Sequence, residues 1–223
     1  MLEARAGIKR PSSPPFQINK AIDELFKKEF DTYRKNQQAH PIMVENSIDA
    51  VPFSHDQLDT WRDTFKGIRT VHKPTNLEIF GGVDDVWVDA DDNLIIVDYK
   101  ATAKAKEVNL DADWQMSYKR QLEVYQWLLR QNGFKVSDTG YFVYANAKFD
   151  GDSFNDSLYF TTKLIAHTGS DKWIEPVLQE IRYTLDGDIP QIGNSIMGGE
   201  CEHCAYAKKR TQLALDYLQK SKK

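Results

Sequence analysis

The chain has 223 residues, of which 41% are hydrophobic, and a formal net charge of −4, so it is long enough for one sizeable core. The negative net charge argues against a protein that coats nucleic acid with a wholly basic surface. No apolar run approaches the roughly 20 residues that a membrane-spanning helix needs. Because the N-terminus also lacks a signal-peptide pattern, we expect one cytoplasmic domain over residues 1–223.

The first half of the chain changes from helical to extended patterns. Apolar residues recur at near-helical spacing after a proline- and serine-rich lead-in, and Ser54 could cap a second, shorter helix. A partly apolar segment with strand character follows. In chain order, the predicted segments are an irregular lead-in at 8–16, a helix at 18–33, a connection at 36–53, a short helix at 54–65 and a strand at 77–89.

The clearest strand pattern is the run of branched apolar residues at 94–100, which ends in Asp98, Tyr99 and Lys100. Side chains alternate between the faces of a strand, so Asp98 and Lys100 share one face and Tyr99 lies on the other. The run is apolar on both faces before Asp98, as in a strand that is covered on both sides. A carboxylate and an ammonium at the rim of such a sheet can together hold a divalent cation and handle its bound water.

A second acidic residue, Asp84 in the segment Gly81-Gly82-Val83-Asp84-Asp85-Val86, could face the same site from the preceding strand. In a regular antiparallel pair, Asp84 and Asp98 point to one face only if opposed residue numbers sum to an even number. The connecting turn, expected within 89–93, should then hold an odd number of loop residues, for instance 90–92, unless one strand carries a bulge. An even, bulge-free turn would separate the two carboxylates.

The second half of the chain predicts a long helix, two strands and a helical C-terminal region. The long helix should end at Gly133, which suits a helix C-cap. In chain order, the predicted segments are a helix at 113–132, strands at 141–147 and 158–166, an amphipathic helix at 173–185 and a last helix around 213–218. This order predicts an α/β fold with a mixed sheet. We expect the core at about 17–166 and a C-terminal extension at about 170–223.

The two cysteines of the chain, Cys201 and Cys204, have the spacing of one edge of a zinc or iron–sulfur site. A closed site needs about four ligands, and His203 is poorly placed between the two cysteines. Two alternatives therefore stay open, a structural metal held in part by this pair and a reduced pair in a cytosolic protein.

Three ordered motifs resemble those of a known family: Gly-x-Val-Asp-x-Val at 81–86, Val-Asp-Tyr-Lys at 97–100, and Gln121-x-x-x-Tyr125 on the next helix. Together they are similar to the PD-(D/E)XK nuclease superfamily, and more narrowly to its RecB-like branch, which includes the CRISPR-associated adaptation exonucleases. The resemblance implies a restriction-endonuclease-like fold, with a mixed central β-sheet flanked by helices and, here, a C-terminal helical extension that carries the cysteine pair. It also implies a metal-dependent nuclease that hydrolyses DNA with activated water, on ends or single strands.

The resemblance also implies roles for the residues at the strand ends. Asp84 and Asp98 would bind Mg²⁺ or Mn²⁺, with the main-chain carbonyl of Tyr99 as a further ligand. Lys100 would orient or deprotonate the attacking water and offset charge in the transition state.

The helix after these strands is expected to contact the nucleic acid. Gln121 and Tyr125 lie one helical turn apart, so both can face the site, and in related enzymes such residues support the metal site and contact the DNA backbone. Tyr118 and Lys119 precede them on the same helix. Aromatic side chains can also stack on bases, and those expected to be exposed are Trp87, Trp114, Tyr118 and Trp127, of which Trp114 and Tyr118 are the preferred candidates.

The chain departs from the family pattern in two places. RecB-like nucleases usually place a His or Glu on the first helix as an additional metal ligand, and here Asp23 is the substitute, with Glu24 behind it, unless both are exposed helix charges. Relatives with a four-iron cluster use four cysteines, so neither an intact iron–sulfur cluster nor a zinc site is expected. These departures leave an alternative, a non-catalytic nucleic-acid-binding or scaffolding subunit that keeps the fold. DNA is the expected partner in either case, and no membrane contact is expected.

Overall fold

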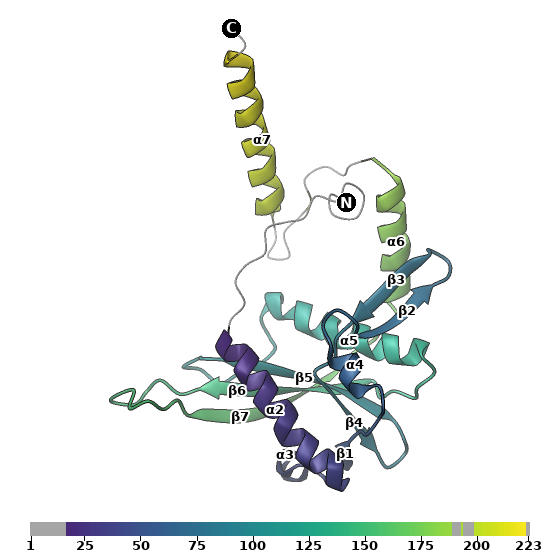
Figure 1. Ribbon diagram of the computed structural model, residues 1–223, viewed down its shortest axis with the longest axis vertical. Coiled ribbons are helices and arrows are strands. Elements are labelled where there is room, and N and C mark those ends of the chain that lie inside the picture. The colour runs from purple at the N-terminus through teal and green to yellow at the C-terminus, as the bar shows by residue number, and fades with distance from the viewer. Residues whose placement is uncertain (1–16, 189–192, 194–198, 222–223) are drawn as a thin grey trace. The chain divides into compact units, whose positions relative to one another are not determined.

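The computed structural model describes residues 17–188, 193 and 199–221 (Figure 1). These residues divide into two compact units, of which one ends at Leu178 and the other begins at Gln179. The predicted lead-in at 8–16 lies outside the described residues. The helices are α2 (Gln17–Asn36), α3 (Pro41–Glu45), α4 (Leu58–Arg62), the 3₁₀ helix η1 (Asp113–Gln115), α5 (Met116–Gln131), α6 (Ile174–Asp186) and α7 (Glu202–Lys220); the strands are β1 (Ala50–Pro52), β2 (Ile68–His72), β3 (Leu77–Gly81), β4 (Asp85–Asp89), β5 (Leu94–Thr102), β6 (Thr139–Ala147) and β7 (Phe160–Thr168).

Five of the described strands form a mixed sheet in the order β1-β4-β5-β6-β7, while β2 and β3 pair in a separate two-stranded sheet. Strands β5 and β6 run parallel, and the other neighbours in the large sheet are antiparallel. Helix α5 lies between β5 and β6 in the chain, which is the crossover that a parallel pair requires. The predicted α/β fold with a mixed sheet is therefore confirmed.

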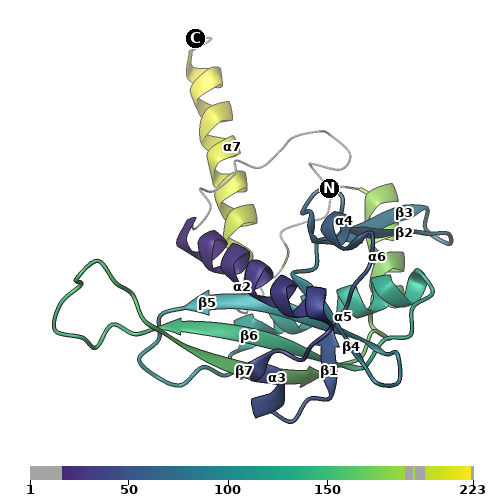
Figure 2. The same ribbon diagram turned by 60° about the horizontal axis from the view of Figure 1, so that its bottom comes forward.

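Helices cover both faces of the large sheet. On one face, Phe30 of α2 packs with Trp87 and Val97, and Figure 2 shows α2 lying over the sheet. On the other face, Leu122 of α5 packs with Ile96. Strand β5 is thus buried on both sides, as its unbroken apolar run predicts. The expectation that Trp87 and Trp127 are exposed is wrong, because both side chains are buried in these layers.

The turn between β4 and β5 has the odd loop that the shared site requires. Asp85 pairs with Val97 and, further along, Val88 pairs with Leu94. The N–H of Asp89 donates to the carbonyl of Asn93 at 3.1 Å, which leaves residues 90–92 as the loop. The last of them, Asp92, has a φ of 60°, as is usual in three-residue hairpins. The register therefore continues to Asp84 opposite Asp98, and the two side chains share a face.

The predicted strand at 77–89 is wrong as a single element. The chain leaves β3 at Gly81 and enters β4, in the other sheet, at Asp85. Helix α4 holds the bend between these strands, because the N–H of Val83 donates to the carbonyl of Trp61 at 3.0 Å. A Cβ built on Gly82 would lie 3.1 Å from the carbonyl oxygen of Asp63. The strand is thus interrupted where the Gly81-Gly82 pair, which weakens a strand locally, meets a contact from a distant segment.

Three further predictions need correction, and one strand was not predicted. The connection expected at 36–53 contains α3 and β1, and the last helix begins at Glu202 rather than near residue 213. Strand β2 has no counterpart among the predicted segments, and the short helix predicted at 54–65 is confined to α4. These short elements depend on distant partners, as when Ala50 of β1 pairs with Asp89 of β4. None of the described helices is long and apolar enough to cross a membrane.

The end of α5 follows the prediction closely. Gly133 has a φ of 86° and donates its N–H to the carbonyl of Arg130 at 3.0 Å, while Phe134 donates to Leu129 at 3.1 Å. These two bonds form the Schellman motif, which satisfies carbonyls at a helix C-terminus. The C-cap prediction at Gly133 is confirmed.

Candidate active site

Asp84 and Asp98 meet where the bend after β3 joins the large sheet. Asp84 immediately precedes β4, and its Oδ2 accepts a hydrogen bond of 2.8 Å from the main-chain N–H of Tyr99. Asp98 lies on β5 and only 1% of it is exposed. Two carboxylates, one just before β4 and one on the neighbouring β5, thus converge at one edge of the core.

Burial and mutual repulsion keep this pair from holding two negative charges easily. Burial, then the charges of Asp98 and Asp23, raise the pKa of Asp84 to about 7, against smaller opposing effects of Lys100 and the Tyr99 N–H. Burial also raises the pKa of Asp98, although Lys100 opposes that shift. Buried carboxylates close to one another shift in this direction because the charged form lacks solvation and repels its neighbour. Such perturbed groups are typical of functional sites.

Lys100 lies on the same face of β5 as Asp98 and forms an ion pair with its Oδ2. Its Nζ also lies 4.7 Å from the centre of the Tyr118 ring of α5. The ring face is the electronegative part of an aromatic side chain and attracts a cation. One carboxylate and one ring therefore fix the amine beside the acidic pair.

Gln121 and Tyr125 lie on the side of α5 that faces the acidic pair. The Nε2 of Gln121 donates to the Tyr125 hydroxyl at 2.8 Å. Burial, with contributions from the charges of Asp84 and Asp98, raises the pKa of Tyr125 to about 12. A Cβ on Gly81 would lie 2.6 Å from the Tyr125 ring, so the first glycine of the Gly-Gly pair makes room for this tyrosine.

Asp23, the expected ligand on the first helix, lies at a small pocket beside this site. The pocket has a volume of about 120 Å³ and is lined in part by Asp23, Tyr99, Lys100 and Tyr118. The carboxylate of Asp23 forms an ion pair of 2.6 Å with Lys27, one turn along α2. Within the described ranges, no group of three or more His, Cys, Asp or Glu side chains has a geometry that could hold a metal ion. The role of Asp23 as a ligand stays a prediction.

The acidic pair nevertheless fits a divalent cation. The two buried carboxylate oxygens of Asp98 have no hydrogen-bond partner among the described residues, apart from contacts with Lys100 and with the carboxyl group of Asp84. When both are ionised, Asp84 and Asp98 repel each other, and a cation bound between them would offset this repulsion and favour their charged forms. Carboxylate and carbonyl oxygens are the ligands that Mg²⁺ prefers. The donor set at this position is therefore suitable for Mg²⁺ or Mn²⁺.

The predicted nucleic-acid contacts form an aromatic and basic border next to Lys100. Trp114 and Tyr118 contact each other edge to face, with ring centres 5.4 Å apart. Lys104 lies over the Trp114 ring at 5.4 Å. Trp114, Tyr118 and Lys119 are all partly exposed. Side chains of this kind are available to stack on bases or to meet phosphates.

One buried tyrosine beside the site was not among the predicted site residues. Tyr144 of β6 lies beside Lys100 in the parallel register and is 3% exposed. Its hydroxyl makes no hydrogen bond of good geometry within the described chain, and burial raises its pKa to about 12 against a smaller opposing effect of the Gln115 side chain. The strand pattern predicted that Tyr144 lies in the sheet. It did not predict that the Tyr144 side chain lies on the same face of the sheet as the site on β5.

Asp85 is the second residue that the sequence analysis missed. It is fully buried and accepts hydrogen bonds from Arg34, Arg62 and the Tyr99 hydroxyl. The sequence feature that could have identified Asp85 is its position directly after Asp84. Because neighbours on a strand point to opposite faces, only one of them can face the site, and the other needs a cationic partner on the second face.

The cysteine pair lies in the second unit, at the beginning of α7. Cys201 is the N-cap residue of that helix, and both cysteines are free thiols. Hydrogen bonding by Cys204 lowers the pKa of Cys201. The described chain brings no further metal ligands to this pair, so a structural metal at these positions stays a prediction.

Comparison with known proteins agrees with this geometry. The family model of the PD-(D/E)XK nuclease superfamily matches residues 4–208, which span all three motifs. No curated protein matches the chain, and no solved structure matches it either. The mixed five-stranded sheet flanked by helices is the restriction-endonuclease-like fold of that superfamily. The chain therefore belongs to the PD-(D/E)XK nuclease superfamily.

Proposed function

We propose that the chain is a divalent-metal-dependent deoxyribonuclease of the RecB-like branch, which hydrolyses phosphodiester bonds of DNA single strands or ends with water. Membership of the superfamily supports nuclease activity in general. The observation that carries the proposal is the convergence of Asp84, Asp98 and Lys100 on one face of two neighbouring strands. This combination supplies an acidic metal site and a cation beside it.

Asp84 and Asp98 are the proposed ligands of Mg²⁺ or Mn²⁺, the metals that this superfamily generally uses. The main-chain carbonyl of Tyr99 and the carboxylate of Asp23 are the proposed further oxygen ligands. When bound, the cation would lower the pKa of a water molecule and offset charge on the phosphate.

Lys100 would orient the attacking water and stabilise the negative charge that develops on the phosphate. Its amine is held in place before substrate binds, by Asp98 on one side and the Tyr118 ring on the other. A preorganised cation needs little rearrangement when charge develops, and removal of such a group typically slows a reaction about 10²–10³-fold.

The face of α5 next to the site would contact the DNA backbone. Gln121 and Tyr125 support each other through their hydrogen bond and lie behind the acidic pair. Tyr118 and Lys119 are closer to the start of the helix and are more exposed than Tyr125. We propose that these residues bind the DNA strand, with Tyr118 stacking on a base.

A non-catalytic DNA-binding subunit is the alternative. The observation that favours it is the ion pair between Asp23 and Lys27, which engages the preferred candidate for a third side-chain ligand. Tight DNA binding without a calorimetric signal for Mn²⁺ would support this alternative.

The test is a cleavage assay with the purified full chain, end-labelled single-stranded DNA and blunt duplex DNA, in Mn²⁺ or in chelator. The expected result is cleavage that needs Mn²⁺ and that is at least about 100-fold slower in Lys100→Ala. The proposal is contradicted if both DNAs stay intact, or if the wild type and Lys100→Ala cleave at the same rate.

A further inference from the structure

A buried ionic cluster lies behind the acidic pair, on the other face of β4. We call Asp31 and Arg34 of α2, Arg62 of α4 and Asp85 of β4 the arginine cluster. Asp85 is 0% exposed and accepts hydrogen bonds from Arg34 at 2.5 Å and Arg62 at 3.0 Å. Two cations and two anions give the cluster no net formal charge, which is how buried charges are tolerated.

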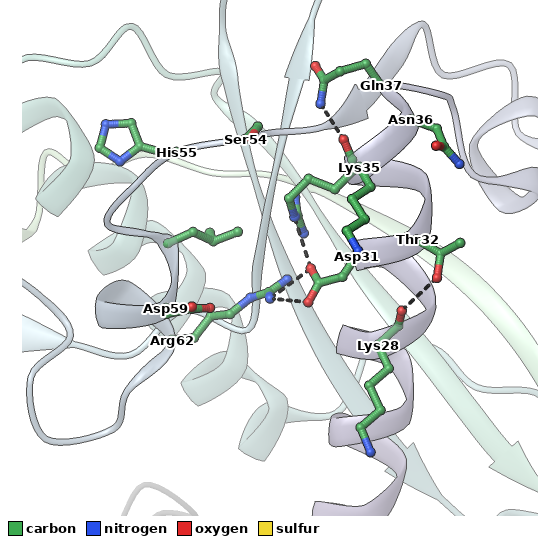
Figure 3. A pocket seen from close by; sticks show the side chains of 12 residues that line it. Lys28, Asp31, Thr32, Lys35, Asn36, Gln37, Ser54, His55, Asp59 and Arg62 are labelled. Carbon is green, nitrogen blue, oxygen red and sulfur yellow. Dashed lines mark hydrogen bonds and ion pairs between the residues drawn. The ribbon is translucent and has the colours of Figure 1, made fainter.

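The two arginines make nearly equivalent contacts. Each binds both Asp31 and Asp85, and their side chains are 9% and 8% exposed. Figure 3 shows Asp31 and Arg62 pointing toward each other from α2 and α4, with their ion pair dashed. On these contacts alone, loss of either arginine should have the same effect.

The third contact of each arginine differs. Arg34 donates from Nη1 to the carbonyl of Phe53 at 2.7 Å, in the segment after β1. Arg62 donates from Nε to the carbonyl of Asp84 at 3.2 Å. Only Arg62 is therefore bonded to a residue of the proposed metal site.

The same helix also holds the residue before Asp84. Trp61, next to Arg62, accepts a hydrogen bond from the N–H of Val83. The segment of α4 therefore contacts the bend at two places, the N–H of Val83 and the carbonyl of Asp84. This bend separates two sheets, so β3 does not fix the direction of the Asp84 side chain.

We propose that Arg62 is a positioning residue for Asp84, whose carboxylate it directs toward Asp98 by holding the main-chain carbonyl. The inference rests on the proposed metal-dependent function, since Arg62 would act through a metal ligand without contacting the metal or the DNA. Groups that orient a metal ligand typically contribute 10–100-fold to metal affinity.

The two arginines provide a matched test, with Arg62→Gln as the variant and Arg34→Gln as the control. Both changes remove one positive charge from the same two carboxylates, so their effects on the local charge and on the free energy of unfolding should be similar. Mn²⁺ affinity is measured by titration calorimetry on the full chain, and the free energy of unfolding is measured in urea. We expect Arg62→Gln to bind Mn²⁺ about 10-fold more weakly than Arg34→Gln does.

Equal Mn²⁺ affinities in the two variants would overturn the positioning role, because the arginine cluster would then act only on stability. Absence of Mn²⁺ binding in the wild type would overturn both this inference and the proposed metal site, so the two failures can be told apart. If Arg62→Gln does not fold, Arg62→Lys and Arg34→Lys form the replacement pair. Lysine keeps the charge but cannot reproduce the guanidinium contacts, and the same difference in Mn²⁺ affinity is expected.

Discussion

The main-chain N–H of Tyr99 donates a hydrogen bond of 2.8 Å to the carboxylate of Asp84. This bond joins the bend before β4 to the strand that carries Asp98 and Lys100. The Tyr99 hydroxyl, on the other face of β5, donates to Asp85 at 2.7 Å. Tyr99 therefore joins the acidic pair to the arginine cluster behind it.

Lys100→Met should separate catalysis from metal binding. We expect the single-turnover rate of DNA cleavage to fall about 10²–10³-fold, while Mn²⁺ affinity is unchanged or higher because a competing cation leaves Asp98. Lys104→Met is the control, since Lys104 also lies over an aromatic ring but is not in the ion pair with Asp98. Equal loss of rate in both variants would show that positive charge near the site matters in general, and would contradict a specific role for Lys100.

The metal-free protein should lose stability as the pH rises from about 4 to about 7. The pKa of Asp84 is raised from 3.8 to about 7 in the folded state, so between these values the folded chain holds a proton that the unfolded chain has released. The free energy of unfolding therefore decreases with pH across this window. Urea unfolding in chelator at several pH values measures the slope, and Asp84→Asn, which cannot titrate, should show a weaker decrease. Identical slopes would contradict the raised pKa.

Two buried tyrosines should respond differently to loss of their hydroxyls. Tyr99→Phe removes a bond to the buried carboxylate of Asp85 and should lower the free energy of unfolding by about 1–3 kcal/mol. Tyr144→Phe removes a hydroxyl that makes no hydrogen bond of good geometry in the described chain and only a weak contact with Gln115, so the free energy of unfolding should stay about the same or rise. Urea unfolding of the two variants checks this, and a larger loss in Tyr144→Phe would contradict the hydrogen bonding described.

Gly81→Ala should disturb the packing of Tyr125, because the added methyl would overlap its ring. Overpacking of this kind typically costs about 1–3 kcal/mol, and the displaced tyrosine should also slow DNA cleavage. In Gly151→Ala the nearest atom to the new Cβ is 4.0 Å away, so this control should keep wild-type stability and rate. Similar results for the two alanine variants would refute the tight contact.

The sequence predicted those parts of the fold and site that depend on local patterns. The apolar run before Asp98 identified β5, side-chain alternation assigned its faces, and Gly133 located the end of α5. The odd loop between β4 and β5 also followed from a simple condition on register. These features depend on few residues that are close together in the chain.

The remaining features depend on contacts between distant residues. Residues 77–89 read as one strand apart from the Gly81-Gly82 pair, and the contacts of α4 with residues 82–84 lie where β3 and β4 separate. The arginines of the cluster look like ordinary helix charges in the sequence, and Arg34 lies 51 positions from Asp85. Their partner could be inferred only in part, from the rule that Asp84 and Asp85 cannot both face one site.

The most direct test of the central claim is a crystal structure of the protein soaked in Mn²⁺, examined by anomalous scattering. We predict a manganese peak between Asp84 and Asp98, at a coordination distance from an oxygen of each carboxylate that falls within about 2.0–2.6 Å, the span for hard divalent cations with oxygen ligands. A manganese peak elsewhere, or no peak between these carboxylates at saturating Mn²⁺, would contradict the account.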